Sequence, residues 1–85
     1  MVVVRLLGGA RKAIGRDYVT FEAEQTSVSE LVSFLQNASA EPRLIQRDNL
    51  LIAINGVESS ALQGTDTIIK NNDSVTIVTV VHGGS

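Results

Sequence analysis

Residues 27–39, with the sequence SVSELVSFLQNAS, decide the fold, because they give the clearest helix signal in a chain otherwise rich in strand-like segments. Ser27 precedes Glu30 by three residues, which is the spacing of a capping box at a helix N-terminus. Apolar side chains then recur at steps of three and four residues, as on one face of a helix, at Val28, Leu31, Val32, Leu35 and Ala38. Pro42 disfavours a longer helix. The pattern predicts a helix from about residue 27 to residue 39 with one apolar face.

Two strand-like segments precede this helix. Residues 2–7, VVVRLL, are rich in β-branched side chains, and Gly8-Gly9 closes the run. Residues 18–23, YVTFEA, alternate polar and apolar side chains, as in a strand with one buried face. Residues 8–17 lie between the two and contain three glycines, so we expect a loop there.

Further strand signals follow the helix. Residues 50–54, LLIAI, run directly into Asn55-Gly56, which strongly favours a tight hairpin turn. Residues 57–58 then form a short return strand, and residues 59–69 are expected to be irregular. A second turn at residues 71–73, NND, precedes a strand over residues 74–81. We therefore expect one domain over residues 1–81 and a flexible tail over residues 82–85.

The order strand, strand, helix, strand, short strand, strand predicts an α+β fold of two layers. The helix should cover the apolar face of the sheet, formed by Val4, Leu6, Val19, Phe21, Ile52, Ile54, Val75 and Ile77. Arg5 marks the opposite, outer face, and the first and last strands should lie side by side.

Composition excludes several classes of function. The chain has 85 residues and a net charge of −2, without the cluster of basic residues that nucleic-acid binding requires. It has no cysteine and a single histidine, so we expect neither a metal site nor a catalytic constellation, and the protein is predicted not to be an enzyme. It lacks both a run of roughly 20 apolar residues and a signal peptide, so we expect a cytoplasmic protein without membrane contact.

The remaining candidate site is the tail, which contains Gly83-Gly84. Glycines lack a Cβ atom, so a Gly-Gly segment can lie extended in a narrow tunnel of a partner enzyme. The alternative is that a Gly-Gly pair near a terminus is a linker remnant or a frayed end. The strand and helix order of this chain favours the functional interpretation.

Residues 47–84 resemble the ubiquitin-related modifier family of sulfur carriers. The resemblance rests on the hydrophobic strand of residues 50–55, LLIAIN, on the entry to the last strand at residues 72–75, NDSV, and on the ending of residues 81–84, VHGG. The archaeal small modifier proteins and the small subunit of molybdopterin synthase are relatives in this view. The resemblance implies a ubiquitin-like β-grasp fold, with a mixed sheet of four to five strands packed on one helix.

The resemblance also implies a function at the tail. A ubiquitin-activating-like enzyme would use ATP to adenylate Gly84, and a sulfur donor would convert the adenylate to a thiocarboxylate. The sulfur would serve tRNA wobble-uridine thiolation by a tRNA thiolase, or the activated terminus would join protein lysines. In this view Gly83 gives access, His82 and Val81 are read by the partner, and the chain itself binds no cofactor.

Two other functions remain open. The chain could be the small sulfur-donating subunit of a molybdopterin-synthase-like complex, or a ubiquitin-like interaction module that is never conjugated. Ser85 bears on this choice, because it follows Gly84 and blocks its carboxylate. Either a protease removes Ser85, or Ser85 is an addition to the natural chain, or the chain is never activated. We expect removal by a processing protease.

Alternation along the strands predicts a second, possible partner surface on the outer sheet face. Its residues are Val3, Arg5, Leu7, Leu51, Thr76, Val78 and Val80. Exposed apolar patches often mark protein contacts, although scattered surface valines are also common. We expect a monomer, because no element is apolar on all sides.

Overall fold

The predicted helix forms as α2, Val28–Ala38. The fold is seen in a computed structural model that describes residues 1–46 and 49–79. Ser27 caps α2, since the backbone N–H of Glu30 donates to Ser27 Oγ at 3.1 Å. The apolar face is buried at Val28, Leu31, Val32 and Leu35. Ala38 is exposed, so its assignment to the buried face was wrong; it is the last residue of the helix.

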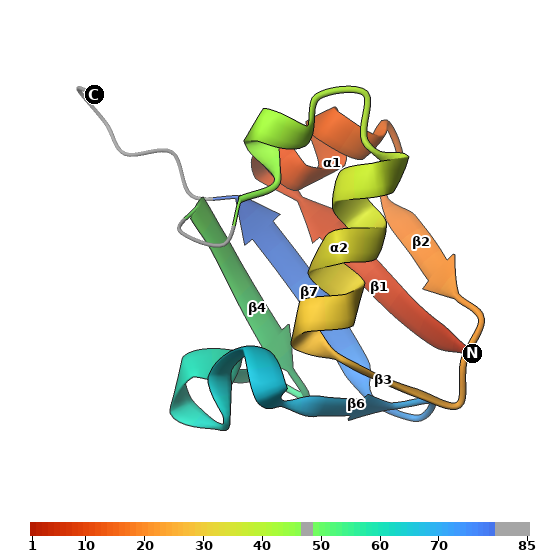
Figure 1. Ribbon diagram of the computed structural model, residues 1–85, viewed down its shortest axis with the longest axis vertical. Coiled ribbons are helices and arrows are strands. Elements are labelled where there is room, and N and C mark those ends of the chain that lie inside the picture. Colours follow the sequence, from red (N-terminus) through yellow and green to blue (C-terminus); the bar gives the residue numbers. More distant parts are fainter. Residues whose placement is uncertain (47–48, 80–85) are drawn as a thin grey trace.

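The main sheet has five strands in the order β2-β1-β7-β4-β5. Their bounds are β1 Val2–Leu7, β2 Tyr18–Phe21, β4 Leu50–Ile54, β5 Val57–Glu58 and β7 Ser74–Thr79. β1 and β7 are parallel, whereas the other pairs are antiparallel. The first and last strands therefore lie side by side, and the sheet is mixed, as expected. α2 crosses one face of this sheet (Figure 1).

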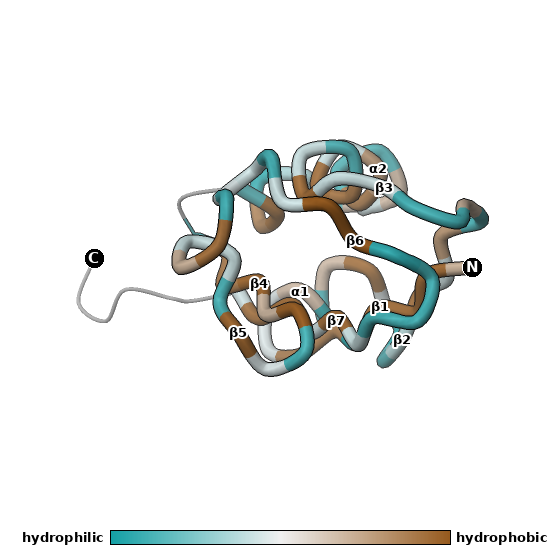
Figure 2. Tube along the Cα trace, turned by 90° about the horizontal axis from the view of Figure 1, so that it is seen from below, coloured by the Kyte–Doolittle hydropathy of each residue, from teal (hydrophilic) through white to brown (hydrophobic). Residues whose placement is uncertain are grey.

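The core lies between the sheet and α2. The residues predicted to face the helix are buried or pack against the buried cluster, and Val2, Ile45 and Ile69 join them. Seen from below, α2 and β3 form one layer and the five-stranded sheet forms the other (Figure 2). The period of two along the strands and of three to four along α2 thus placed the core correctly.

The segment expected to be a loop, residues 8–17, begins with a second helix, α1, Gly8–Ile14. The sheet therefore carries two helices where one was expected. Ala10 and Ala13 are buried, and Ile14 packs against the core. Gly8 has φ 58° and turns the chain from β1 directly into the helix. The helical spacing of these three apolar side chains was present in the sequence, but the neighbouring glycines outweighed it.

A second sheet pairs β3, Gln25–Ser27, with β6, Ile68–Lys70. Neither strand was predicted, and residues 68–69 had been assigned to an irregular segment. Each strand has only three residues, so its pattern is too short to identify before its partner is known. Short 3-10 turns lie at Pro42–Leu44, Ser59–Ala61 and Gly64–Asp66.

The two predicted turns form, and they are bound to each other. Asn55 and Gly56 both have positive φ, 54° and 83°, as the hairpin requires. The Asn55 side chain donates to Asp73 Oδ1 at 3.0 Å and accepts from the Ser74 N–H at 2.9 Å. The Lys70 N–H donates to Asp73 Oδ2 at 2.8 Å. This bond from Lys70, followed by the one from Asn55, lowers the pKa of the Asp73 carboxyl below its ordinary value.

Candidate functional site

The predicted reactive tail lies outside the described residues. The tail was expected over residues 82–85, which are His82, Gly83, Gly84 and Ser85. Val81, expected to be recognised by the partner, and Val80, expected on the partner surface, lie outside the described residues as well. Thr79 is the last described residue and marks the point from which the tail continues. It pairs with Leu50 in β4 and forms a parallel bridge with Gly8. The tail therefore starts at the end of the sheet where β4, β7 and the beginning of α1 meet (Figure 1).

The base of the tail is closely packed. Thr79 is 8% exposed, although it is polar, and its Oγ1 has no hydrogen-bond partner among the described residues. A Cβ atom added to Gly9 would lie 3.0 Å from the Cβ atom of Thr79, which is closer than side chains normally approach. Gly9 therefore lets α1 approach the end of β7. The sequence had indicated only that Gly8-Gly9 closes a strand.

The outer face of the sheet contains the described residues of the predicted partner surface. Strand register places Leu7 beside Val78 and Val78 beside Leu51, so these three form one apolar row across the sheet. Leu51 is 43% exposed, whereas Leu7 and Val78 are half-buried. This row lies at the end of the sheet near Thr79. Thr79, the last described residue, and the most apolar part of the outer face are therefore neighbours.

A second row crosses the same face. Arg5 pairs with Tyr18 on one side and with Thr76 on the other, and Thr76 pairs with Ala53. Arg5 is exposed and Thr76 is half-buried. Val3 is 41% exposed and lies farther along β1, opposite Ser74, so it is separated from the apolar row by the Arg5 row. The predicted surface is thus apolar near Thr79 and more polar away from it.

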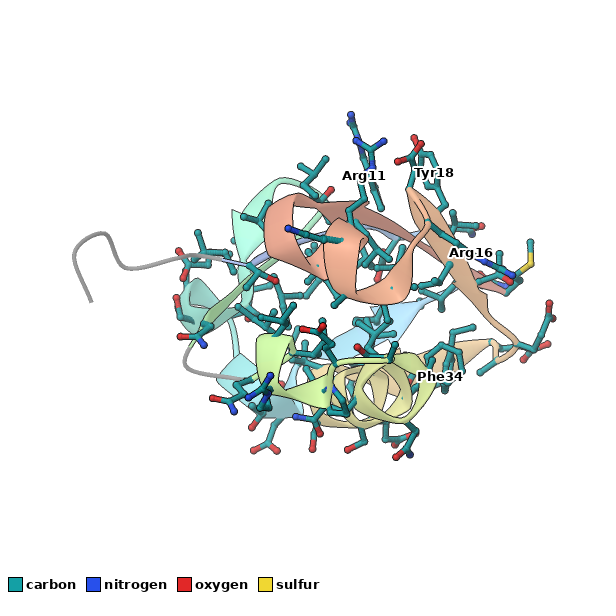
Figure 3. The ribbon with its side chains drawn as sticks, turned by 90° about the horizontal axis from the view of Figure 1, so that it is seen from above. Arg11, Arg16, Tyr18 and Phe34 are labelled. Carbon is teal, nitrogen blue, oxygen red and sulfur yellow. The ribbon has the colours of Figure 1, made fainter. Side chains whose placement is uncertain are left out.

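Charged residues border the apolar row. Arg11 forms a salt bridge with Asp17, and both side chains are mostly exposed. Arg11 and Tyr18 point together away from α2, toward the outer side of the sheet (Figure 3). A shallow hollow of about 190 Å³ lies there, lined by Arg5, Leu6, Leu7, Arg11, Asp17 and Tyr18. The salt bridge reduces the net charge of this corner, so Arg5 is its main positive group.

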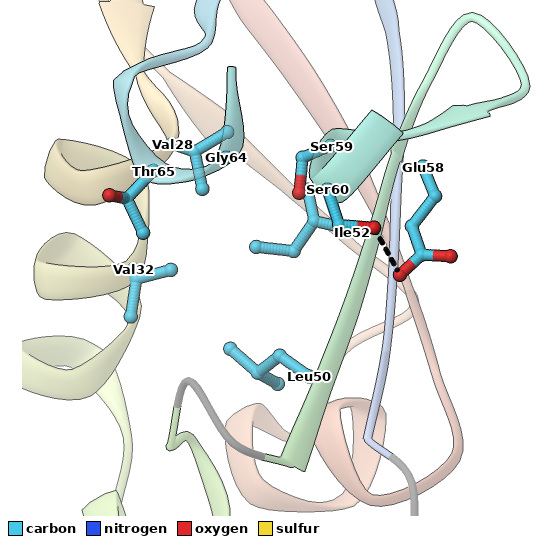
Figure 4. A pocket seen from close by; sticks show the side chains of 9 residues that line it. All are labelled: Val28, Val32, Leu50, Ile52, Glu58, Ser59, Ser60, Gly64 and Thr65. Carbon is cyan, nitrogen blue, oxygen red and sulfur yellow. Dashed lines mark hydrogen bonds between the residues drawn. The ribbon is translucent and has the colours of Figure 1, made fainter. Parts of the chain in front are cut away.

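A separate hollow of about 200 Å³ lies between α2 and β4 (Figure 4). Its apolar walls are Val28, Val32, Leu50 and Ile52, and its rim contains Glu58, Ser59, Ser60, Gly64 and Thr65. The Ser60 hydroxyl donates to Glu58 Oε1 at 2.9 Å. Glu58 is the single ionisable residue of this lining, so the hollow lacks an acid and base pair for catalysis.

The described residues contain neither a metal-binding cluster nor a membrane-spanning helix. Within residues 1–46 and 49–79, no group of three or more His, Cys, Asp or Glu side chains is placed to hold a metal ion. No helix in the same part of the chain is long and apolar enough to cross a membrane.

A mixed five-stranded sheet with α2 across one face is the ubiquitin-like β-grasp architecture. The solution structure of the small archaeal modifier protein 1 (SAMP1) from Methanosarcina acetivorans has this fold, with a TM-score of 0.76 and 24% identity over 98% of this chain and 95% of that chain. Urm1 from Trypanosoma brucei gives a TM-score of 0.72 and 19% identity over 98% of this chain and 94% of its own. A chain in the crystal structure of the Amycolatopsis orientalis BexX/CysO complex gives a TM-score of 0.72 and 21% identity, over 99% of this chain and 100% of that chain.

The sequence model of the ThiS family matches residues 4–84, so this chain belongs to the ThiS family. The family and its structural neighbours are ubiquitin-like small sulfur carriers and modifiers, which are not catalysts themselves. Comparison with curated protein sequences gave no match. The match includes positions 83 and 84, which lie in the predicted tail.

Proposed function

We propose that this protein is a sulfur carrier and protein modifier that is activated at Gly84. The observation that supports this most is the ThiS-family match, which extends through Gly83 and Gly84 at the end of the chain. β7 ends at Thr79, five positions before Gly84. A fully extended segment of that length spans at most about 18 Å. Gly84 can therefore enter a partner's active site only if that partner also lies close to the end of the sheet.

The proposed activation takes place in the partner enzyme. A carboxylate oxygen of Gly84 attacks the α-phosphate of ATP, and pyrophosphate leaves. Hydrosulfide supplied by a sulfur donor then attacks the acyl carbon, and AMP leaves as the carbon–sulfur bond forms. The product is a thiocarboxylate, whose sulfur serves tRNA wobble-uridine thiolation; alternatively, the adenylate reacts with the amine of a protein lysine. ATP binds to the activating enzyme in this scheme, and this chain supplies only the acyl group.

The apolar row of Leu7, Val78 and Leu51 is the proposed docking surface for the activating enzyme. It is partly exposed and lies at the same end of the sheet as Thr79. Contact with this row would hold the tail base near the active site, and Gly83 would keep the approach to Gly84 free of side chains. His82 and Val81 are proposed to be recognised along the tail. We further propose that the protein acts in the cytoplasm, as a monomer until it meets its partner.

Ser85 must be removed before activation in this proposal, because its peptide bond occupies the Gly84 carbonyl. The decisive experiment incubates chains that end at Gly84 and at Ser85 with ATP and an activating enzyme. Intact mass then reports the adenylate and, with a sulfur donor, the thiocarboxylate. We expect both products only from the chain that ends at Gly84.

Three results would contradict the proposal. Activation of the chain that retains Ser85 would contradict the processing step. Full biological activity after deletion of Gly83 and Gly84 would indicate a ubiquitin-like interaction module that needs no tail. Stable purification with a single large synthase subunit, without tRNA-thiolation proteins, would indicate a molybdopterin-synthase-like complex. Residues 79–82, TVVH, lack the prolines that the molybdopterin subunits carry before Gly-Gly, so we do not prefer that function.

A further inference from the structure

A groove lies between α2 and the edge strand β2, and it shares no residue with the apolar row. It has a volume of about 340 Å³ and is lined by Ile14, Arg16, Val19, Thr20, Phe34 and Ala38. We call it the β2 groove. Among the described strands, β2 is at one edge of the sheet and pairs with β1 alone. Figure 3 shows Phe34 on α2 next to β2, on the side of the molecule opposite to that of Arg11 and Tyr18.

The free edge of β2 carries unpaired backbone groups. The Leu6 N–H donates to the Asp17 carbonyl at 2.7 Å, immediately before β2 begins. Hydrogen-bonded and non-bonded residue pairs alternate along antiparallel strands. Val19, two residues after Asp17, therefore directs its N–H and C=O toward β1. The N–H and C=O groups of Tyr18 and Thr20 consequently point to the open edge, where an additional strand can bind them.

The groove beside this edge is apolar inside. Val19 and Phe34 are half-buried and belong to the set that packs against the core. The Phe34 ring meets the Phe21 ring edge to face, with centroids 5.0 Å apart, which fixes the orientation of both rings. Ile14, at the end of α1, contributes a further apolar wall. A strand added to β2 would direct every second side chain over these groups, because side chains alternate between faces.

Charges differ between the two ends of β2. Arg16 lines the groove just before β2, and Lys12 is exposed on α1. The salt bridge found in the described part of the chain uses Arg11 with Asp17 and does not include Arg16 or Lys12. Glu22 is exposed just after β2. A ligand with negative charge at the Arg16 end is therefore favoured over one with negative charge at the Glu22 end.

We propose that the β2 groove binds an extended segment of a partner protein, apolar at alternate positions and acidic at one end, which adds to β2 as a sixth strand of the sheet. The acidic end lies at Arg16. An antiparallel orientation is slightly more stable than a parallel one, so the acidic residues should follow the apolar ones in the partner sequence. The lining of this groove includes neither Thr79 nor the row of Leu7, Val78 and Leu51. A partner can therefore hold the β2 groove while an activating enzyme holds the tail.

The test uses the full chain and a fluorescein-labelled synthetic peptide in which valine alternates with threonine and two glutamates follow. Binding is measured by fluorescence polarisation, and amide shifts are followed by NMR. We expect saturable binding that weakens with salt and shifts the amides of Tyr18 and Thr20. Thr20→Pro should weaken binding about tenfold or more, because it removes an edge N–H without removing a bond to β1. Arg16→Glu should weaken binding about threefold to tenfold.

Matched variants separate these effects from general damage. Thr20→Val keeps the edge N–H, and Lys70→Glu makes the same charge reversal on β6, which pairs with β3 and does not line the groove. Both variants should bind within about twofold of the wild type. If Thr20→Pro does not fold, the test uses the wild-type protein with a modified peptide that carries N-methylated amides at alternate positions. This modified peptide should fail to bind the wild-type protein. The proposal would be overturned if the peptide showed no saturable binding, or if Thr20→Pro bound it with unchanged affinity. It would also be overturned if the amide shifts were confined to Leu51 and Val78, or if β2 paired with a second copy of the chain.

Discussion

The substitution Val78→Asp gives the sharpest test of the proposed docking surface. Val78 lies on the outer face between Leu7 and Leu51 and is half-buried in the free protein. Full burial of a valine side chain contributes about 1.5–3 kcal/mol, so the half-buried side chain contributes about 1 kcal/mol to folding. A domain of this size is stable by roughly 5–15 kcal/mol. The variant should therefore fold, with a midpoint of thermal unfolding lower by about 4–8 °C.

The effect on binding should be larger than the effect on folding. An activating enzyme that covers the apolar row would bury the rest of Val78, and in the variant it would have to desolvate a carboxylate among Leu7 and Leu51. We expect a loss of at least about 2 kcal/mol, which corresponds to roughly thirtyfold weaker binding. Titration calorimetry with the activating enzyme measures this, and circular dichroism confirms the fold.

The matched control is Asn37→Asp, which adds the same negative charge on an exposed position of α2. This control should bind within about twofold of the wild type. A folded Val78→Asp variant that binds the activating enzyme as tightly as Asn37→Asp does would refute the assignment of the outer face as the docking surface. If both variants lost the same amount of affinity for the activating enzyme, the net charge of the protein alone would determine binding.

Three further predictions concern the stability of the fold. The bonds from the Lys70 N–H and from Asn55 lower the folded-state pKa of Asp73. Its carboxylate therefore stabilises the protein above an unfolded pKa of about 3.9, and this contribution is lost as the pH falls through the folded pKa. Urea titrations over that range should show a smaller pH dependence for Asp73→Asn than for the wild type, and equal pH dependence of the two proteins would contradict the lowered pKa. Gly9→Val should destabilise the fold by about 1–3 kcal/mol, because its Cβ would approach the Cβ atom of Thr79 to 3.0 Å; an unchanged urea midpoint would show that α1 moves freely at the tail base. Ser27→Ala should cost about 1 kcal/mol by removing the helix cap, whereas Ser27→Asp, which retains an acceptor, should lie close to the wild type in thermal unfolding.

The sequence alone determined the elements whose signal is local. The α2 helix follows from the spacing of Val28, Leu31, Val32 and Leu35 and from the Ser27 cap, all within about three turns. Alternation along β1, β4 and β7 separated the buried face from the outer face, because side chains of a strand alternate with a period of two. The turn at Asn55-Gly56 was also predictable, since few residues other than glycine and asparagine accept positive φ.

Tertiary structure decided the elements whose stability depends on distant partners. α1 forms because Ala10 and Ala13 are buried against the core and Gly9 fits against Thr79, a residue 70 positions later in the sequence. β3 and β6 are too short to have a pattern of their own, and pairing defines them. The bond between Asn55 and Asp73 likewise joins two turns that are separate in sequence. The β2 groove is a product of strand order, because only the topology made β2 an edge and placed it beside Phe34. Local patterns encode periodicity and caps, whereas edges, close approaches and grooves arise from contacts between segments far apart in the chain.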